Sequence, residues 1–426
     1  MTESQNLFRI HLALFVLALT LRLFFVFHYT GIPEGDAVTY HRLAQAVLEG
    51  KGLFFEGQTY SRPPVYPLFL AFFYKLGQGP RIVFIAQSIL GALTCNLIFG
   101  LGWRLFHQSI GITAALLTAC SPLFIKASAL LLTESLFTFL LVSLMWQWLC
   151  VKERETFWET FLLGITTATA ILTRSFFLLF PFCPVIYFWM KNQTLSSYQK
   201  MIKSAGILLG CILLIGLWTI RNYNVYGTWI PVSSQGGYAF YSSYHPIKGH
   251  IFGINTKDQT VAFADQLGSE VEKSRYLYQK TLEDILRHPK GTLRLEILKV
   301  LYFWAPFDWE ILGGGQYHFL YGFIFPFFLL GILWAKRRRF FLLTPILYLQ
   351  GVALLFYGSP RFRFPMEPFI FLLGSVGLWG IFQRVPRHSV SWVIILSFLT
   401  VNIGIVAFSI PLKHSLTHLL HRAGLW

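Results

Sequence analysis

The sequence predicts an all-α polytopic membrane protein, and composition and segment length are the observations that predict it. Hydrophobic residues make up 55% of the 426 residues and charged residues only 13%. With a mean hydropathy of +0.56, the chain has more apolar surface than a soluble core can bury. About eleven apolar segments are candidate transmembrane helices, at residues 8–28, 80–104, 110–127, 133–150, 157–173, 176–190, 202–219, 319–335, 340–357, 368–383 and 391–411.

The first span, at residues 8–28, has no small-residue cleavage site behind it. We therefore expect it to remain as a spanning helix and not to be removed as a signal peptide. Several later spans contain proline, which transmembrane helices tolerate because neighbouring helices satisfy the carbonyl groups that proline leaves free. These prolines are Pro181, Pro184, Pro326 and Pro345.

Lysine and arginine in the short loops predict the orientation of the helices. With the N-terminus in the cytoplasm, the inner connections collect most basic residues, including the run at 336–339. The other inner basic residues are Arg104, Lys152, Arg154, Lys191, Lys200, Lys203, Arg384 and Arg387. This orientation places residues 29–79, 220–318 and 358–367 on the outer side, which in a bacterial inner membrane is the periplasm.

The net charge of +16 follows largely from this topology and from contact with anionic lipids. No patch of interleaved aromatic and basic residues indicates binding to nucleic acid. Three segments follow from the same topology. They are an N-terminal transmembrane module at residues 1–219, an outer segment at 220–318, and C-terminal transmembrane helices with a short tail at 319–426.

Cysteine and histidine give little indication of a metal site. The five cysteines lie singly in or beside the spans, without CxxC spacing, so buried thiols are favoured over disulfides or metal ligands. His414, His418 and His421 share one face of a possible tail helix. An amphipathic tail on the membrane surface explains that spacing better than a metal site does.

The first outer loop contains an acidic residue, Asp36, followed by a segment with the pattern of an amphipathic helix. Apolar residues recur at three- to four-residue spacing from Ala37 to Leu48, after Asp36 and before Gly50, which predicts a helix on the bilayer surface. Three prolines between residues 63 and 67 then stiffen the entry to a short interfacial or re-entrant helix. Asp36 has two interpretations, as an ordinary helix N-cap or as an ionisable group kept at the membrane edge for function.

Six ordered motifs carry a family resemblance. They are D-x3-YHRLA-x5-GKG (36–52), RPPVYPLFLAFFY (62–74), LLTESLFTFLL (131–141), LTRS (172–175), WTIRNYNVYGTWIPVSSQGG (218–237) and RFRFPMEP (361–368). In this order the sequence resembles the membrane-embedded glycosyltransferases of the GT-C fold. Within them it is similar to the family 39 group of protein O-mannosyltransferase-like and aminoarabinose-lipid A transferase-like proteins.

The resemblance implies inverting transfer of a sugar from a polyprenyl-phosphate donor to an acceptor on the outer side of the membrane. Members of the group keep an essential aspartate in the first outer loop, and Asp36 matches that position. Protein mannosyltransferases usually have Asp-Glu there, whereas this chain has Asp36 followed by Ala37. Asp36 is therefore the only acid at this position.

The chemistry of such a transfer needs the residue types found here. An attacking hydroxyl must lose its proton, so a carboxylate within hydrogen-bond reach can act as general base, and Asp36 is the candidate. Glu134, expected at the same membrane depth, is the second candidate catalytic acid and would orient the first-loop helix or the acceptor. A structural alternative for Glu134 is a favourable place in the first turn of a helix capped by Thr133.

The leaving lipid phosphate needs fixed donors, and the planar guanidinium of arginine suits phosphate best. Each outer arginine has a structural alternative, since long basic side chains also snorkel from helix ends toward lipid headgroups. The predicted substrate-binding residues are Tyr40, Arg62, Tyr66, Arg174, Arg221, Asn222, Arg361 and Arg363.

The sequence thus predicts a glycosyltransferase whose partners are a polyprenyl-phosphate-linked sugar, membrane lipids and a glycolipid, lipid A, polysaccharide or protein acceptor. No cofactor is indicated with certainty, and a divalent metal remains open. The alternative function is a polytopic transporter or a lipid or sugar flippase. The acids and arginines gather at one membrane surface and the halves show no convincing repeat, which favours the enzyme. A polysaccharide ligase or polymerase on a related fold is a third possibility.

Overall fold

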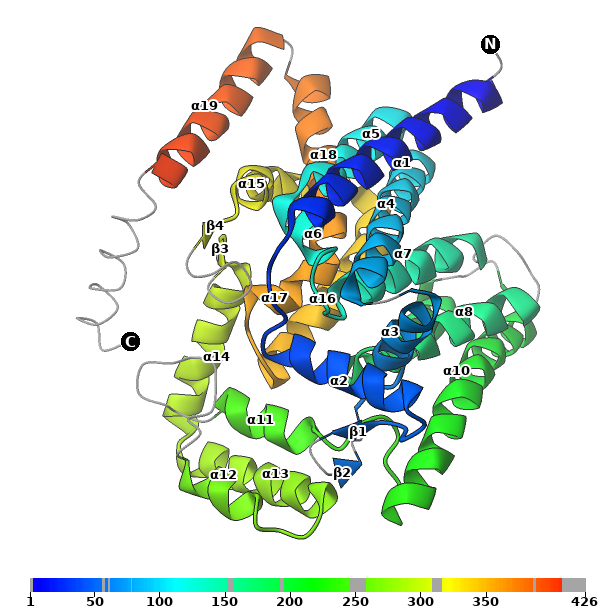
Figure 1. The fold of residues 1–426 in the computed structure, drawn as a ribbon. Coiled ribbons are helices and arrows are strands. Elements are labelled where there is room, and N and C mark those ends of the chain that lie inside the picture. The colour runs from blue at the N-terminus through cyan, green and yellow to red at the C-terminus, as the bar shows by residue number, and fades with distance from the viewer. Residues whose placement is uncertain are drawn as a thin grey trace. The chain divides into compact units, whose positions relative to one another are not determined.

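The computed structural model describes residues 3–55, 58–59, 62–77, 79–151, 157–191, 195–244, 258–308, 316–385 and 388–407. Its chain divides into two compact units, Met1–Ser233 and Ser234–Trp426, and each is described by itself. Both units consist almost entirely of helices (Figure 1). Lys152, Arg154 and Arg387 of the predicted inner connections and the three tail histidines lie outside the described residues.

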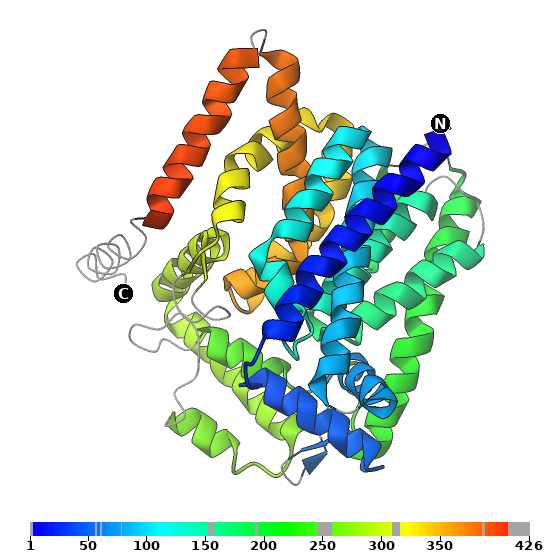
Figure 2. The same ribbon diagram turned by 45° about the horizontal axis from the view of Figure 1, so that its top comes forward.

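The first unit contains ten α-helices and one short antiparallel strand pair among its described residues. The elements are α1 (Glu3–His28), α2 (Asp36–Leu48), β1 (Phe54–Phe55), β2 (Gln58–Thr59), α3 (Val65–Leu76), α4 (Pro80–Leu105), α5 (Gln108–Cys120), α6 (Pro122–Ala127), α7 (Glu134–Val151), α8 (Phe157–Ile171), η1 (Ser175–Phe177), α9 (Phe182–Lys191) and α10 (Ser197–Tyr226). The short helices α2 and α3 lie side by side (Figures 1 and 2).

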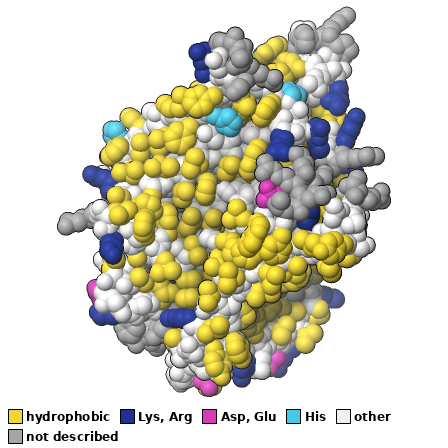
Figure 3. Space-filling model, turned by 90° about the vertical axis from the view of Figure 1, so that its right-hand side faces the viewer, with side chains coloured by type: hydrophobic (Ala, Val, Ile, Leu, Met, Phe, Trp, Pro, Cys, Tyr) yellow, Lys and Arg dark blue, Asp and Glu magenta, His cyan; other side chains and the backbone are white. Residues whose placement is uncertain are grey.

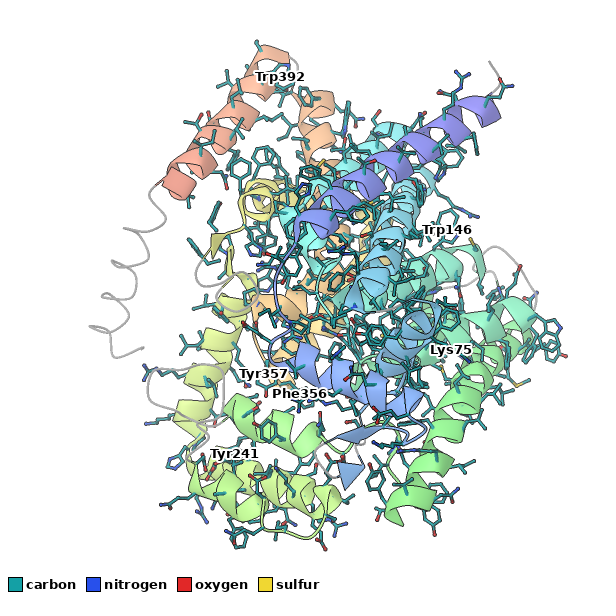
Figure 4. All side chains as sticks on the ribbon, viewed as in Figure 1. Lys75, Trp146, Tyr241, Phe356, Tyr357 and Trp392 are labelled. Atoms are coloured by element: carbon teal, nitrogen blue, oxygen red, sulfur yellow. The ribbon has the colours of Figure 1, made fainter. Side chains whose placement is uncertain are left out.

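The second unit begins with the helices of the outer segment and continues into apolar helices. Its described elements are α11 (Gly236–Tyr244), α12 (Gln259–Ala264), α13 (Glu270–Arg287), α14 (Pro289–Trp304), β3 (Phe307–Asp308), β4 (Gln316–Tyr317), α15 (Phe319–Trp334), η2 (Lys336–Arg338), α16 (Arg339–Leu355), α17 (Pro360–Arg363), η3 (Phe364–Met366), α18 (Glu367–Arg384) and α19 (His388–Ala407). A hydrogen bond between the hydroxyls of Ser242 and Tyr357 ties α11 to the chain just after α16. Tyr357 is labelled in Figure 4.

All eleven predicted spans overlap apolar helices. In the described part of the chain, five of these helices are long and apolar enough to cross a membrane alone, namely Gln5–His28, Pro80–Leu105, Glu134–Val151, Ser197–Tyr226 and Pro360–Arg384. The other six predicted spans coincide with shorter apolar helices. One face of the molecule is covered mainly by hydrophobic side chains (Figure 3). The chain is a multi-pass membrane protein, and the number of crossings stays a prediction.

Three predicted spans differ from the helices that form. The span at 176–190 divides into η1 and α9, with turn residues between them. The span at 110–127 is broken into α5 and α6, because Pro122 has no N–H to continue the helical hydrogen bonds. The span at 202–219 ends too early, since α10 continues to Tyr226 and stops only at Gly227. Gly227 has a φ of 64°, the left-handed conformation that commonly ends a helix.

Arg22 is a buried charge that the sequence analysis did not single out. It lies on α1 with none of its surface exposed. Its guanidinium donates to the carbonyls of Thr118 and Ala119, both at 3.4 Å, at the end of α5. The carbonyl of Thr118 is the one that Pro122 cannot bond. Arg22 therefore compensates, from another helix, for the break between α5 and α6.

Small residues allow α8 and α10 to pack closely. Gly164 lies against the backbone of Ile207, and Gly210 lies against the carbonyl of Phe161. Gly206 and Gly210 form a GxxxG pattern, which brings helix backbones together in membrane proteins. A side chain at either contact would push the two helices apart.

We expect Gly210→Ala to lower the free energy of unfolding by about 1–3 kcal/mol, because its Cβ would overlap backbone atoms of α8. Gly216→Ala is the matched control on the same helix, since no heavy atom lies within 4 Å of its Cβ position. Because alanine favours helix, this control should be neutral or stabilising by up to about 1 kcal/mol. Denaturant titration of the purified protein in detergent measures both, and equal effects would contradict the close packing.

Candidate active site

Asp36 is the first residue of α2. Gly35, with a φ of 54°, precedes it at the N-cap position without a side-chain cap, so the interpretation of Asp36 as the N-cap is wrong. A carboxylate in the first turn is nevertheless favoured by the positive end of the helix dipole. The Asp36 side chain is 43% exposed, and its Oδ1 lies 3.5 Å from Nη1 of Arg62, which is 14% exposed. The acid is therefore accessible, while the arginine beside it is largely buried.

Two tyrosines complete this cluster. Tyr40 follows Asp36 by one helical turn and shares its face of α2. Cζ of Arg62 lies 5.4 Å from the centre of the Tyr40 ring, within the range of a cation–π interaction. The Tyr66 ring on α3 meets Tyr40 edge to face, with the ring centres 5.0 Å apart. Asp36, Tyr40, Arg62 and Tyr66 thus form one contiguous group, which we call the first-loop cluster.

Tyr66 is the fully buried member of the first-loop cluster. Its hydroxyl donates to Oε1 of Gln87 on α4 at 2.9 Å. Burial raises the pKa of Tyr66 well above its usual value, and the Glu134 carboxylate nearby raises it further. Next to it, the backbone N–H of Val65 donates to the carbonyl of Leu172 at 3.0 Å, which fixes the start of α3.

Glu134 and Arg174 form a buried ion pair. Oε1 of Glu134, at the start of α7, lies 2.7 Å from Nη2 of Arg174, which follows α8. The hydroxyl of Thr133 accepts a second hydrogen bond from Nε of Arg174, also at 2.7 Å. The two charged side chains are only 3% and 8% exposed. This geometry joins two helices and gives both predicted site residues a structural partner.

Arg221 and Asn222 lie near the end of α10. Asn222 contacts the segment that follows this helix, at Ile230. Asn222 is fully buried, and its amide nitrogen donates to the carbonyl of Ile230 at 2.9 Å. Arg221 donates to Oδ1 of Asn222 at 3.1 Å, and its guanidinium lies over the ring of Trp218. These contacts account for Asn222 without a ligand, and substrate binding by either residue stays a prediction.

In the second unit, Arg361 and Arg363 occupy different environments. Arg361 on α17 is partly exposed. Arg363 is fully buried and pairs with Glu367, with Nε 3.0 Å from Oε1. It also donates to the carbonyls of Phe303 and Ala305, both at 2.7 Å. Arg363 therefore holds the end of α14 through Nε and Nη1, while its buried Nη2 makes no hydrogen bond within the described part of the chain.

At this site, two features were not predicted from the sequence: the amide of Gln87 and the Thr133 hydroxyl as a hydrogen-bond acceptor. Gln87 is one of two amide side chains in the apolar helix α4, with Asn96, and only its position in a buried stretch could have indicated it. Among the residues that the structure describes, no group of three or more His, Cys, Asp or Glu side chains could hold a metal ion.

Replacing Arg174 by Met would leave the Glu134 carboxylate buried without its partner. We expect this to lower the free energy of unfolding by about 3–5 kcal/mol, as for other broken buried pairs. The double variant R174M/E134L removes both charges and should recover most of that loss. Unfolding titrations of the single and double variants test this. Equal destabilisation of the two would contradict the pairing.

Residues 61–218 match the family model described as dolichyl-phosphate-mannose-protein mannosyltransferase. The matched region includes Arg62, Tyr66, Glu134 and Arg174, and begins after Asp36. No curated protein sequence matches the chain.

The fold is similar to that of solved membrane enzymes. The oligosaccharyltransferase of Archaeoglobus fulgidus, solved with zinc and sulfate, superposes with a TM-score of 0.57 at 15% identity, covering 94% of this chain and 53% of that one. Its apo form gives a TM-score of 0.53 at 14% identity, with 94% and 54% covered. This chain thus spans about half the length of the archaeal enzyme.

ArnT from Cupriavidus metallidurans, bound to undecaprenyl phosphate, matches at 14% identity over 88% of this chain and 77% of that one. Its TM-score is 0.41, so the fold assignment rests on the archaeal enzyme. From that superposition, the protein has the GT-C fold of membrane-embedded glycosyltransferases, as its ordered motifs imply.

Proposed function

We propose that the protein is an inverting glycosyltransferase that moves a sugar from a polyprenyl-phosphate carrier to an acceptor hydroxyl. The single observation that carries this proposal is the accessible Asp36 carboxylate beside the Arg62 guanidinium. Two findings agree with it. The matched family model is named for a dolichyl-phosphate-sugar donor, and the matched fold belongs to an oligosaccharyltransferase. Both favour an enzyme over a transporter or flippase.

In this mechanism Asp36 acts as the general base. The acceptor oxygen attacks C1 of the donor sugar while its proton passes to the Asp36 carboxylate. The bond between C1 and the phosphate oxygen breaks at the same time, and its electron pair leaves with the lipid phosphate. Attack from the face opposite the leaving group inverts the configuration at C1.

Arg62 is the proposed partner of the leaving phosphate. Its guanidinium is held against Tyr40 and is largely buried, so a phosphate oxygen would meet a fixed donor in a poorly hydrated site. The phosphate competes with Asp36 for this arginine. Donor binding would then loosen the ion pair and leave the carboxylate to accept the acceptor proton.

The other predicted site residues have different parts in the proposal. Glu134 and Arg174 have a structural part, as a buried ion pair in the same unit. Arg361, being partly exposed, remains the candidate in the second unit for binding the donor. The acceptor stays within the predicted classes, a glycolipid, lipid A, a polysaccharide or a protein. The proposed location is a bacterial inner membrane with the site facing the periplasm.

Asp36→Asn should lower the rate of sugar transfer by about two to four orders of magnitude, the usual contribution of a general base. Asparagine keeps the size of the side chain and an oxygen for Arg62, so the variant should still fold. Glu49→Gln is the matched control, because Glu49 is an exposed acid at the other end of α2.

The assay supplies undecaprenyl-phosphate-linked sugars with an envelope extract as acceptor and detects the transferred sugar by mass spectrometry. The control should transfer normally. Near-normal transfer by a well-folded D36N protein would remove Asp36 as the base.

The proposed orientation places Gln58 outside and Arg338 in the cytoplasm. In a variant without native cysteines, an impermeant maleimide added to intact cells, after permeabilisation of any outer membrane, should label a cysteine at Gln58. A cysteine at Arg338 should react only after the inner membrane is opened. The reverse labelling pattern would put the first-loop cluster on the wrong side and reject the proposed site.

A further inference from the structure

We infer that Gln87 and Tyr66 are positioning residues that hold the Asp36-bearing face of α2 in place. Neither residue belongs to the transfer chemistry proposed above, and Gln87 is absent from the sequence-based site. The inference rests on the proposed function only where it concerns Asp36 as the base. The physical link between Gln87 and α2 stands on the contacts alone.

The amide of Gln87 is bonded at both ends. Gln87 is fully buried on α4, and Nε2 donates to the carbonyls of Ser128 at 3.1 Å and Leu130 at 2.8 Å. Oε1 accepts from the Tyr66 hydroxyl at 2.9 Å. Rotating the amide by half a turn would place its oxygen against two carbonyl oxygens. The network therefore has one arrangement, and that arrangement fixes the Tyr66 hydroxyl.

Tyr66 transmits this position to the first-loop cluster. Its ring meets Tyr40 edge to face at 5.0 Å and stacks near Phe69 at 6.0 Å. Tyr40 also contacts Arg62, whose guanidinium lies over the Tyr40 ring and pairs with Asp36. Tyr40 and Asp36 are one turn apart on α2. A shift of the Tyr66 ring would consequently move the face that carries the acid.

The two carbonyls that accept from Gln87 lie close in sequence to the second candidate acid. Ser128 and Leu130 stand in the turn between α6 and α7, a few residues before Thr133 and Glu134. One amide thus joins the first-loop cluster to the segment that carries the Glu134–Arg174 pair. Gln87 therefore links the segments that carry the two candidate catalytic acids.

Hydrogen exchange tests the link without any assay of transfer. In Tyr66→Phe, the backbone amides of α2 should exchange about two- to twelve-fold faster, the factor that corresponds to one hydrogen bond. Gln87→Leu should accelerate them further. Ser88→Ala is the matched control, because it removes a buried hydroxyl bond from the next residue of α4 without touching Tyr66. Exchange in α2 should be unchanged in that control.

Transfer kinetics test the consequence for the reaction. Tyr66→Phe should lower kcat about ten- to a hundred-fold, as small displacements of catalytic groups do, while the donor KM stays within about two-fold. In the D36N background the same substitution should cause no further loss of kcat, since positioning matters only while the base is present.

Three results would decide against the inference or separate it from the proposed function. Unchanged α2 exchange in both Y66F and Q87L would overturn it. An equal loss of kcat from Y66F with and without D36N would also overturn it, because that pattern indicates a general loss of folded enzyme. Near-normal transfer by D36N itself would reject the proposed base, and α2 exchange would then decide the inference alone.

Discussion

A charge held away from water needs a partner inside the protein, and this requirement organises the interior of both units. In the first unit Glu134 and Arg174 meet at 2.7 Å between two helices. In the second, Arg363 pairs with Glu367 while bonding the carbonyls at the end of α14. Removing one member of such a pair costs several kcal/mol because the other charge stays buried. Each pair therefore fixes the helices that carry it. In the first unit, the position of the exposed Asp36 depends on helices fixed in this way.

The two candidate catalytic acids of the first unit differ in exposure, and the proposed mechanism gives them different roles. Asp36 is 43% exposed beside an arginine, so it can exchange protons with an incoming group. Glu134 is 3% exposed and already holds a guanidinium, which leaves it little capacity to take part in proton transfer. The proposed base and the supporting acid thus lie in different environments, although both are carboxylates placed early in a helix.

Much of the fold could be predicted, because transmembrane helices follow directly from apolar length. Hydropathy averaged over a segment does not show the effect of a single residue. For this reason the helix break at Pro122 and the buried Arg22 were not predicted. Within the site, Asp36 and Arg62 were predicted from charge at the membrane edge, and they do lie together. Gln87 could not be predicted, since its importance comes from carbonyls and a hydroxyl that only tertiary packing brings to it.

Arg22 has a consequence for the order in which the chain assembles during synthesis. Apart from the carbonyl of Ala18 on α1 itself, its partners come from residues 73 to 97 positions later, at Cys95 and at the end of α5. When α1 leaves the ribosome, that arginine has neither α4 nor α5 beside it. A lone arginine in a helix of this kind is costly in lipid, so α1 must remain near the translocon or the headgroups until those helices are made. Biogenesis of the first unit is therefore cooperative over nearly a quarter of the chain.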